Sequence, residues 1–214
     1  GLVVIICLYT AGIFVKKKYY KDVDLLEARK IEMSHSPVQH EMSKVKHLKM
    51  TGQTEELFEK WRSKWDDIAA SRLPEVEEFL IDAEESIDKY RFRKAKMILS
   101  AIKEHLDETE GQIKELLSEI QQLIDGEKQS REQIGQLKEI YRKNKKTLLA
   151  HRHNFGKAEK VLEELLEEVN SQFQKYDELT GNGDYLIAME LVEEIKERLD
   201  YISGKMKTVP DLLV

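Results

Sequence analysis

The sequence predicts an all-α fold built from long helices, on three observations. Apolar residues recur at every third or fourth position over long stretches, which is typical of helices packed lengthwise against one another. Charged residues make up 36% of the 214 residues and aromatic residues only 7%, a composition that argues against compact globules. Turn-forming residues are scarce, with three prolines and ten glycines. We therefore expect an elongated chain of helices, and not a disordered one, because its apolar residues are regularly placed.

Residues 1–15 carry no charge and are followed at once by a cluster of lysines and tyrosines. Spanning a bilayer takes about 20 apolar residues, so we interpret residues 1–15 as a transmembrane helix whose first residues are missing from this sequence. The lysines would stop transfer and place the following chain in the cytoplasm. A signal peptide and a buried core helix are the alternatives. No small-residue cleavage site follows the segment, and nothing else in the chain is apolar enough to surround it.

The residues of this N-terminal region fall into two sets. The predicted anchor residues are Leu2, Val3, Val4, Ile5, Ile6, Leu8, Ile13, Phe14 and Val15. The predicted stop-transfer and interface residues are Lys16, Lys17, Lys18, Tyr19, Tyr20 and Lys21. Residues 1–50 carry a net charge of +4 and the remainder −10, so the basic end of the chain lies beside its apolar segment. This pairing indicates a lipid bilayer as one partner.

Residues 16–53 are expected to form a basic juxtamembrane stalk and a short helix. The stalk helix ends before Pro37, because proline disfavours helical backbone at the residue that precedes it. The short helix stops at Thr51-Gly52, since glycine commonly ends helices.

An amphipathic helix is expected over residues 54–72, with Thr54 as its N-cap and acidic residues in its first turn. Trp61 and Trp65 lie one turn apart on the apolar face of this helix. They either pack against a neighbouring helix or form an exposed aromatic patch for a partner, since Trp is enriched at binding hot spots. The sequence leaves both interpretations open.

A repeat of 93 residues organises the rest of the chain. Phe92 aligns with Tyr185 and Ala95 with Ala188, and the apolar ladders that follow them coincide. Heptad patterns match by chance at multiples of seven, and 93 is not such a multiple. The repeating unit is a helix, a turn, a second helix, a turn and a third helix that continues as the first helix of the next unit.

This pattern predicts spectrin-like, antiparallel three-helix repeats that share long continuous helices. The first repeat is expected over residues 73–160. The second begins at residue 161 and is cut short, so it covers residues 161–214. Turns are expected near residues 91, 126 and 182, where glycine and polar residues interrupt the ladders.

The strongest ladder lies between Ile134 and Tyr176, where apolar residues hold a repeat that averages 3.5 residues. Gly156 lies inside this ladder without shifting its phase, whereas a break would normally reset the phase. The sequence therefore predicts one continuous helix through Gly156, about 65 Å long at 1.5 Å per residue. This helix would join the two repeats.

One half of this ladder is apolar without a gap, whereas the other half admits three polar residues, Asn144, His151 and Gln172. Buried polar residues can fix the register and the number of packed helices. Alternatively, a partner needs these groups, because His151 opens a polar stretch at the expected junction between repeats. The candidate partner-binding residues are Trp61, Trp65, His151, Arg152, His153 and Phe155.

The sequence indicates no catalytic, cofactor or metal site. Residues 181–183 start like a dinucleotide-binding motif, but no strand precedes them and Leu186 occupies the position of the third glycine. His151 and His153 point to different sides of a helix and cannot share a metal ion. Acidic pairs lie on solvated helix faces without a pocket. We predict a protein that is not an enzyme and takes no cofactor or small-molecule substrate; its acidic charge disfavours nucleic acid.

Three segments beyond the apolar N-terminus carry a family resemblance. They are SKVKHLKMTGQTEELF at residues 43–58, LAHRHNFG at residues 149–156, and GDYLIA at residues 183–188, which leads to VPDL at residues 209–212. Together with the anchor and the lysine cluster, they resemble the N-terminal part of the EzrA family, the septation ring formation regulators of low-GC Gram-positive bacteria. The resemblance covers essentially the whole chain.

The resemblance implies a longer, membrane-anchored protein with several spectrin-like repeats, its N-terminus outside the cell and its helical rod in the cytoplasm. It also implies a regulator that binds FtsZ, the tubulin-like division GTPase, restrains FtsZ ring assembly at inappropriate sites and joins the septal ring. Other division and cell-wall synthesis proteins are implied as further partners. The family's C-terminal patch linked to midcell localisation lies beyond the end of this chain. A purely structural, membrane-tethered helical spacer is the alternative.

Overall fold

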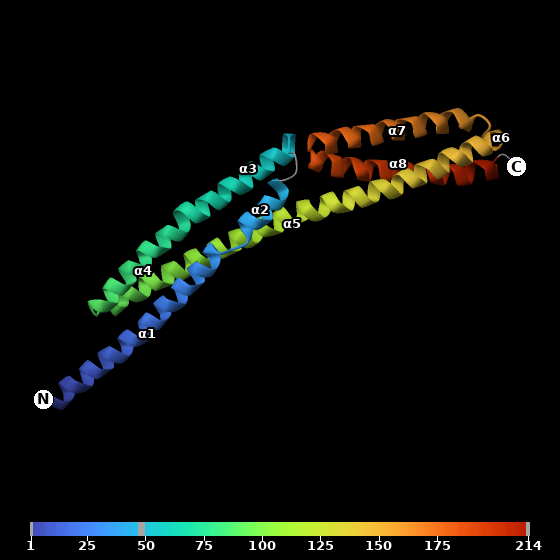
Figure 1. Ribbon diagram of the computed structural model, residues 1–214. Coiled ribbons are helices and arrows are strands. Elements are labelled where there is room, and N and C mark those ends of the chain that lie inside the picture. Colours follow the sequence, from blue (N-terminus) through green and yellow to red (C-terminus); the bar gives the residue numbers. More distant parts are fainter. Residues whose placement is uncertain (1, 47–49, 213–214) are drawn as a thin grey trace. The chain divides into compact units, whose positions relative to one another are not determined.

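The computed structural model describes the backbone of residues 2–46 and 50–212 and the side chains of residues 9–46 and 50–208. Regular structure in these ranges is helical throughout, which confirms the all-α prediction (Figure 1). In chain order the elements are α1 (Leu2–Ser34), α2 (Val38–Lys46), α3 (Gly52–Asp67), the π-helical turn η1 (Ile68–Arg72), α4 (Leu73–Asp88), α5 (Phe92–Ala150), α6 (Arg152–Phe155), α7 (Ala158–Asn182) and α8 (Tyr185–Leu212).

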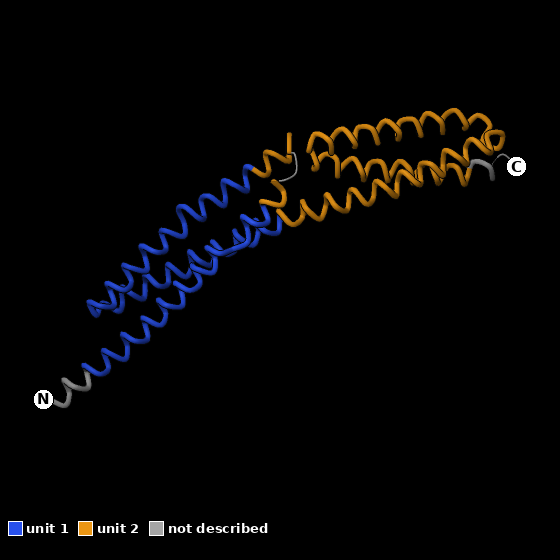
Figure 2. The backbone as a smooth tube through the Cα atoms, in the orientation of Figure 1, with its two compact units in different colours: residues 1–42, 59–119 blue, residues 43–58, 120–214 orange. Residues whose placement is uncertain are grey.

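The chain divides into two compact units (Figure 2). Unit 1 consists of residues 1–42 and 59–119, and unit 2 consists of residues 43–58 and 120–214. The long helix α5 contributes its first part to unit 1 and its second part to unit 2. One helix can serve both units because buried residues recur along it at helical spacing, as at Leu116, Ile120 and Leu123.

Unit 1 is built from α1, the path from α3 to α4, and the first part of α5. Helix α1 lies along α4 and buries Val23 and Leu26. Arg29 on α1 donates from Nε to Glu110 Oε2 on α5 at 3.2 Å. Hydrogen bonds from Lys114 and from Arg29 lower the pKa of Glu110 to about 2. The segment expected to be a stalk is therefore packed into this bundle.

The path from α3 to α4 does not break at residue 72, where the helix expected over residues 54–72 would end. The π-helical turn η1 joins the two helices, and Pro74 follows it within the first turn of α4. A π-helical turn shifts the local hydrogen-bond pattern, which accommodates the missing N–H of a proline. Proline more often marks a helix start, so the sequence pattern favoured a boundary here.

Unit 2 buries one core between the second part of α5, α7 and α8. Leu148 on α5 and Ile195 on α8 are among its most deeply buried side chains. Asn144 lies in the same core and donates from Nδ2 to Ser203 Oγ on α8 at 2.8 Å. A buried polar contact between two helices supports the interpretation that the polar ladder residue Asn144 fixes helix register.

Two of the segments that carry the resemblance meet in unit 2. The N–H of Thr51 donates to the Gly183 carbonyl at 3.3 Å, and the Thr51 hydroxyl donates to the preceding carbonyl at 3.0 Å. Thr54, expected to cap its own helix, is buried and instead accepts a hydrogen bond from the Leu186 N–H at 3.3 Å. These contacts hold the start of α3 against the α7–α8 turn.

The prediction of one continuous helix from Ile134 to Tyr176 is wrong. Helix α5 ends at Ala150, and α6 separates it from α7. The rings of Tyr141 on α5 and Phe173 on α7 lie 5.6 Å apart, so the chain reverses direction between them. Gly156 lies in this reversal with φ 51° and ψ −125°.

The apolar ladder could not reveal this reversal, because the reversal preserves the phase. It occupies residues 151–157, which is one heptad in length. Leu148 before it, Phe155 within it and Leu162 after it are all buried in the core of unit 2. A regular apolar period therefore fits two helices joined by such a turn as well as it fits one straight helix.

The predicted turn at residues 125–126 is also wrong, since α5 runs through this position. Gly126 serves close packing there: a Cβ built on it would lie 2.5 Å from the Cε atom of Met189 on α8. The helix shared by the two units is thus α5. The repeat boundaries at residues 73–160 and 161–214 stay a prediction, without the continuous helix on which they rested.

Gly156→Ala is expected to destabilise the protein by about 1–3 kcal/mol, because its backbone conformation is strained for any residue with a Cβ. Gly135→Ala is the matched control, at an exposed helical position where nothing lies within 4 Å of the added carbon. The control should gain about 0.5–1 kcal/mol. Urea unfolding followed by circular dichroism measures both changes. Stabilisation at both positions would instead support the continuous helix.

Candidate interaction surfaces

The start of α1 is the predicted membrane anchor. Six of its side chains lie outside the described residues: Leu2, Val3, Val4, Ile5, Ile6 and Leu8. The others lie on α1 and are exposed, with Ile13 at 46%, Phe14 at 76% and Val15 at 37%. Among the residues that the structure describes, no helix combines the length and the apolar content that crossing a membrane requires.

The predicted stop-transfer and interface residues lie beside the α4–α5 turn of unit 1. Lys16 Nζ is 2.6 Å from Asp88 Oδ1, and the Tyr20 hydroxyl donates to the same oxygen at 2.8 Å. Tyr19 stacks on Phe92, the first residue of α5, with ring centroids 5.4 Å apart. The remaining members of this set are exposed on α1: Lys17, Lys18 and Lys21.

This contact between α1 and the α4–α5 turn is polar and aromatic. Hydrogen bonds from Lys16 and from Tyr20 lower the pKa of Asp88, and the same bond to Asp88 raises the pKa of Tyr20. Tyr90 forms the turn with φ 54°, an uncommon conformation for a residue other than glycine. The rings of Tyr90 and Phe92 pack edge to face, with their centroids 5.8 Å apart, and Tyr90 is 53% exposed. The turn is thus tied to α1 while it presents an aromatic ring to solvent.

Trp61 and Trp65 are buried in unit 1, with 0% and 6% of their surfaces exposed. The indole N–H of Trp61 donates to Glu119 Oε2 on α5 at 2.6 Å. The pair therefore does not form an exposed aromatic patch, and the packing interpretation describes both residues. The sequence could not decide between the two, because periodicity shows which residues share a face but not what covers that face.

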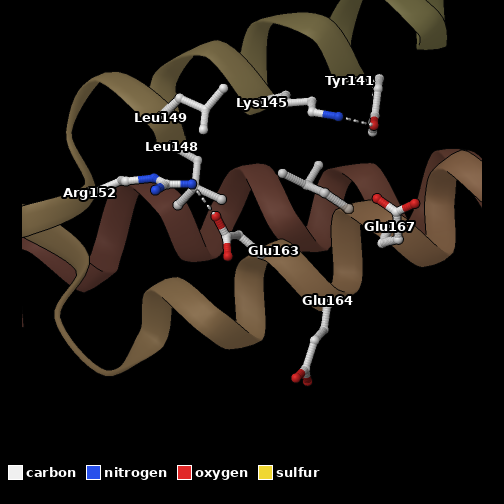
Figure 3. Close-up of a pocket in the computed structure, with 9 residues that line it drawn as sticks. Tyr141, Lys145, Leu148, Leu149, Arg152, Glu163, Glu164 and Glu167 are labelled. Atoms are coloured by element: carbon white, nitrogen blue, oxygen red, sulfur yellow. Dashed lines mark hydrogen bonds and ion pairs between the residues drawn. The ribbon is translucent and has the colours of Figure 1, made fainter.

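A groove with a volume of about 400 Å³ lies between α5 and α7 in unit 2 (Figure 3). Its apolar part comes from Leu148, Leu149 and Leu166. Its charged residues come from both helices and from the reversal between them: Lys145, Arg152, Glu163, Glu164 and Glu167. Leu149 is 52% exposed, so the groove offers apolar surface as well as charge.

Ion pairs and a cation–π contact lie along this groove. Arg152 Nη2 donates to Glu163 Oε1 at 2.6 Å, and its Nε lies 3.2 Å from Glu159 Oε1 (Figure 3 shows the first of these contacts). Lys145 Nζ lies 3.3 Å from the Tyr141 hydroxyl and 5.6 Å from the centre of that ring. Both basic side chains are therefore held near the groove, while the pairs remain solvent-exposed and individually weak.

The other candidate partner-binding residues lie in the reversal between α5 and α7. His151, Arg152 and His153 are exposed, and of these Arg152 lines the groove. Phe155 is 2% exposed, so it anchors the reversal in the core rather than meeting a partner.

Sequence reasoning missed the acidic side of the groove. A continuous helix would separate Arg152 from Glu163 by about 16 Å along its axis, whereas the reversal brings them into contact. No local signal marks Glu164 or Glu167 as special, since each resembles any exposed acidic residue on a helix.

The groove's side chains are suited to recognition. Within residues 9–46 and 50–208, no three His, Cys, Asp or Glu side chains come together closely enough to hold a metal ion. The groove combines apolar side chains with charges of both signs, a mixture that suits noncovalent contact with another protein.

Known proteins show clear similarity to the whole chain. The family model described as "Septation ring formation regulator, EzrA" matches residues 1–214. The chain is 46% identical over 217 residues to the septation ring formation regulator EzrA of Geobacillus sp. (strain WCH70), and 44% identical over 212 residues to that of Bacillus subtilis (strain 168). Each alignment covers 99% of this chain and 38% of the relative, so the chain spans well under half the length of these relatives.

A solved structure is also similar. It is described as the cytoplasmic domain of bacterial cell division protein EzrA, and it matches with a TM-score of 0.64 and 38% sequence identity. The match covers 91% of this chain and 34% of the solved chain.

Proposed function

Because the chain belongs to the EzrA family of septation ring formation regulators, we propose that it is the N-terminal part of a membrane-anchored regulator of bacterial cell division that binds FtsZ. The protein restrains FtsZ ring assembly at inappropriate sites and takes part in the septal ring, alongside other division and cell-wall synthesis proteins. The observation that carries this proposal is the family match over residues 1–214.

The start of α1 is the membrane anchor in this proposal. An uncharged run reaches Val15, and the exposed side chains of Ile13 and Phe14 at its end would face lipid. The lysines that follow favour an orientation with the N-terminus outside and both helical units in the cytoplasm. Concentration at the septum then follows from binding to the FtsZ ring.

The groove between α5 and α7 is the FtsZ-binding surface in this proposal. It combines the exposed Leu149 with basic and acidic groups, so it can bury an apolar anchor and orient a charged partner. Arg152 is held at its rim by Glu163, which pre-organises one charged contact and reduces the entropy lost on binding.

Restraint of assembly requires a difference in affinity between two states of FtsZ. A protein that binds the monomer more tightly than the filament shifts the equilibrium away from the filament. A tenfold preference is worth about 1.4 kcal/mol, which a single well-placed charged contact can supply. Attachment to the membrane confines this effect to the layer in which the ring would form.

The proposal is tested by mixing the 214-residue chain, in mild detergent, with FtsZ and GTP and following light scattering and pelleting. The groove variant Glu164→Lys/Glu167→Lys leaves the Arg152–Glu163 pair intact, and Glu132→Lys/Glu178→Lys makes the same charge change at exposed positions outside the groove. We expect the chain and the control to reduce the FtsZ pellet, and the groove variant to act at least about tenfold more weakly. No effect and no binding at stoichiometric excess would contradict the proposal.

A purely structural spacer is the second candidate function, and one observation favours it. Helix α5 runs without interruption from Phe92 to Ala150 and supplies both units, as a spacer between other parts of a protein would. The spacer predicts that the chain does not bind FtsZ. It also predicts that function in cells tolerates charge changes on the groove but not shortening of α5.

A further inference from the structure

The end of unit 1 that carries the α4–α5 turn is strongly basic. Residues 89–96 hold five Lys or Arg side chains and no Asp or Glu, and residues 16–21 of α1 add four lysines. The two segments are in contact, because Lys16 and Tyr20 bind Asp88 while Tyr19 stacks on Phe92. Segments far apart in the sequence therefore form one surface, which we call the basic end.

Two acidic groups at the basic end are paired, and residues 16–24 and 84–96 together still hold nine Lys or Arg against five Asp or Glu. Asp88 is bound by Lys16, and Glu85 accepts a hydrogen bond from Lys89. Three further cations are exposed on the turn and on the first turn of α5: Arg91, Arg93 and Lys94. The net field of this surface is therefore positive, although the whole chain carries a net charge of −6.

Aromatic and apolar side chains accompany these charges. The ring of Tyr90 lies against α1 at Gly12, where an added Cβ would be 3.4 Å from the ring, and Gly12 belongs to the uncharged run. Tyr90 and Met97 are 53% and 68% exposed, and Phe14 on the adjoining stretch of α1 is 76% exposed. Exposed aromatic rings beside basic residues are typical of surfaces that lie at the boundary between water and lipid.

We propose that the basic end is a second membrane contact, in which the α4–α5 turn binds the headgroups of an anionic lipid surface. The inference rests on the proposed function only in that α1 brings the chain to a membrane. Charge complementarity identifies the occupant as a polyanion, and the contact of Tyr90 with the uncharged run of α1 favours lipid over nucleic acid. An apolar anchor alone would bind neutral and anionic membranes equally well. The basic end would add a preference for anionic headgroups.

The expected strength follows from the number of exposed cations. Each Lys or Arg near an anionic bilayer contributes roughly fivefold to partitioning, and the effect is screened by salt. Three such side chains on the turn and on α5 therefore contribute on the order of 100-fold.

The test is co-flotation of the full 214-residue chain with two sets of vesicles, one of phosphatidylcholine and one of phosphatidylcholine with 30% phosphatidylglycerol, at low and high salt. The turn variant is Arg91→Glu/Arg93→Glu/Lys94→Glu, in which glutamate near the start of α5 also suits the helix dipole. The control Lys143→Glu/Lys146→Glu/Lys157→Glu makes the same charge change at exposed positions of unit 2. Circular dichroism establishes that all three chains are folded.

The parent and the control should prefer the anionic vesicles. In the turn variant this preference should fall by at least about 100-fold, because glutamate both removes the three cations and adds repulsion, while its binding to neutral vesicles is unchanged. An unchanged preference in the turn variant, or an equal loss in the control, would overturn the inference. Failure of the proposed anchor would give a different result. No chain would then bind neutral vesicles, whereas salt-sensitive binding to anionic vesicles would persist. Equal binding to both vesicles by every chain would retain the anchor and reject the basic end.

Discussion

Replacing Trp61 with alanine is expected to destabilise unit 1 by about 3–5 kcal/mol, the usual cost of removing a fully buried large aromatic side chain. Trp61 has none of its surface exposed, and its indole N–H reaches Glu119 on α5 at 2.6 Å. The change therefore leaves a cavity between α3 and α5 and removes a charge-assisted hydrogen bond. Trp65 remains as the sole tryptophan and lies in unit 1, so its fluorescence during urea unfolding reports on that unit.

Met97→Ala is the matched control in the same unit, because Met97 is 68% exposed. Substitutions at such surface positions usually change the free energy of unfolding by less than about 0.5 kcal/mol. With a urea m-value of about 1–3 kcal/mol per molar, the Trp61 variant should unfold at least 1 M earlier than the control. Similar midpoints for both variants would mean that Trp61 lies on the surface, as the partner-patch interpretation supposes.

Gly126→Pro is expected to destabilise the protein by about 3 kcal/mol or more, because proline inside a helix removes one hydrogen bond and clashes with the preceding turn. Residue 126 lies well inside α5, which both units use, and α8 packs against it through Met189. Helical content, measured by circular dichroism at 222 nm, should fall, and the thermal unfolding of unit 2 should shift to lower temperature.

Gly126→Ala separates the effect of proline from that of added bulk. Its Cβ displaces only the flexible end of Met189, and alanine favours the helix, so the net change should stay within about 1 kcal/mol. A proline variant as stable as the alanine variant would show that the chain turns at residues 125–126, as the local sequence suggests.

Local patterns in the sequence predicted the helices well where their ends carry clear signals. The ladder before residue 90 is buried at Val76, Leu80 and Ile87, and a turn follows it at residues 89–91. The alignment at a shift of 93 residues placed Phe92 on Tyr185, and each of these opens a helix after a turn. Such features depend on neighbours in the chain, which periodicity reports directly.

Features that depend on distant residues were not predictable in this way. Gly126 allows a close approach by Met189 from α8, whereas Gly156 allows a strained reversal, and nothing in their flanking sequences distinguishes the two uses. The candidate interaction surfaces likewise depend on residues that are distant in the chain. The contact of Tyr19 with Phe92 and that of Arg152 with Glu163 both require a chain path that the apolar period alone does not determine.

The reversal of the chain at residues 151–157 creates the groove proposed to bind FtsZ, because this groove exists only if α7 lies against α5. Lys138 on α5 and Asp177 on α7 are 39 residues apart, yet their side chains lie 3.2 Å from each other. Spin labels on cysteines at these two positions, with Cys7 replaced by serine, report the separation by double electron–electron resonance. We expect a short distance, on the order of the 8–10 Å between packed helix axes plus the length of the labels. A distance of about 58 Å, the length of a continuous helix between the two positions, would contradict the reversal and remove the groove.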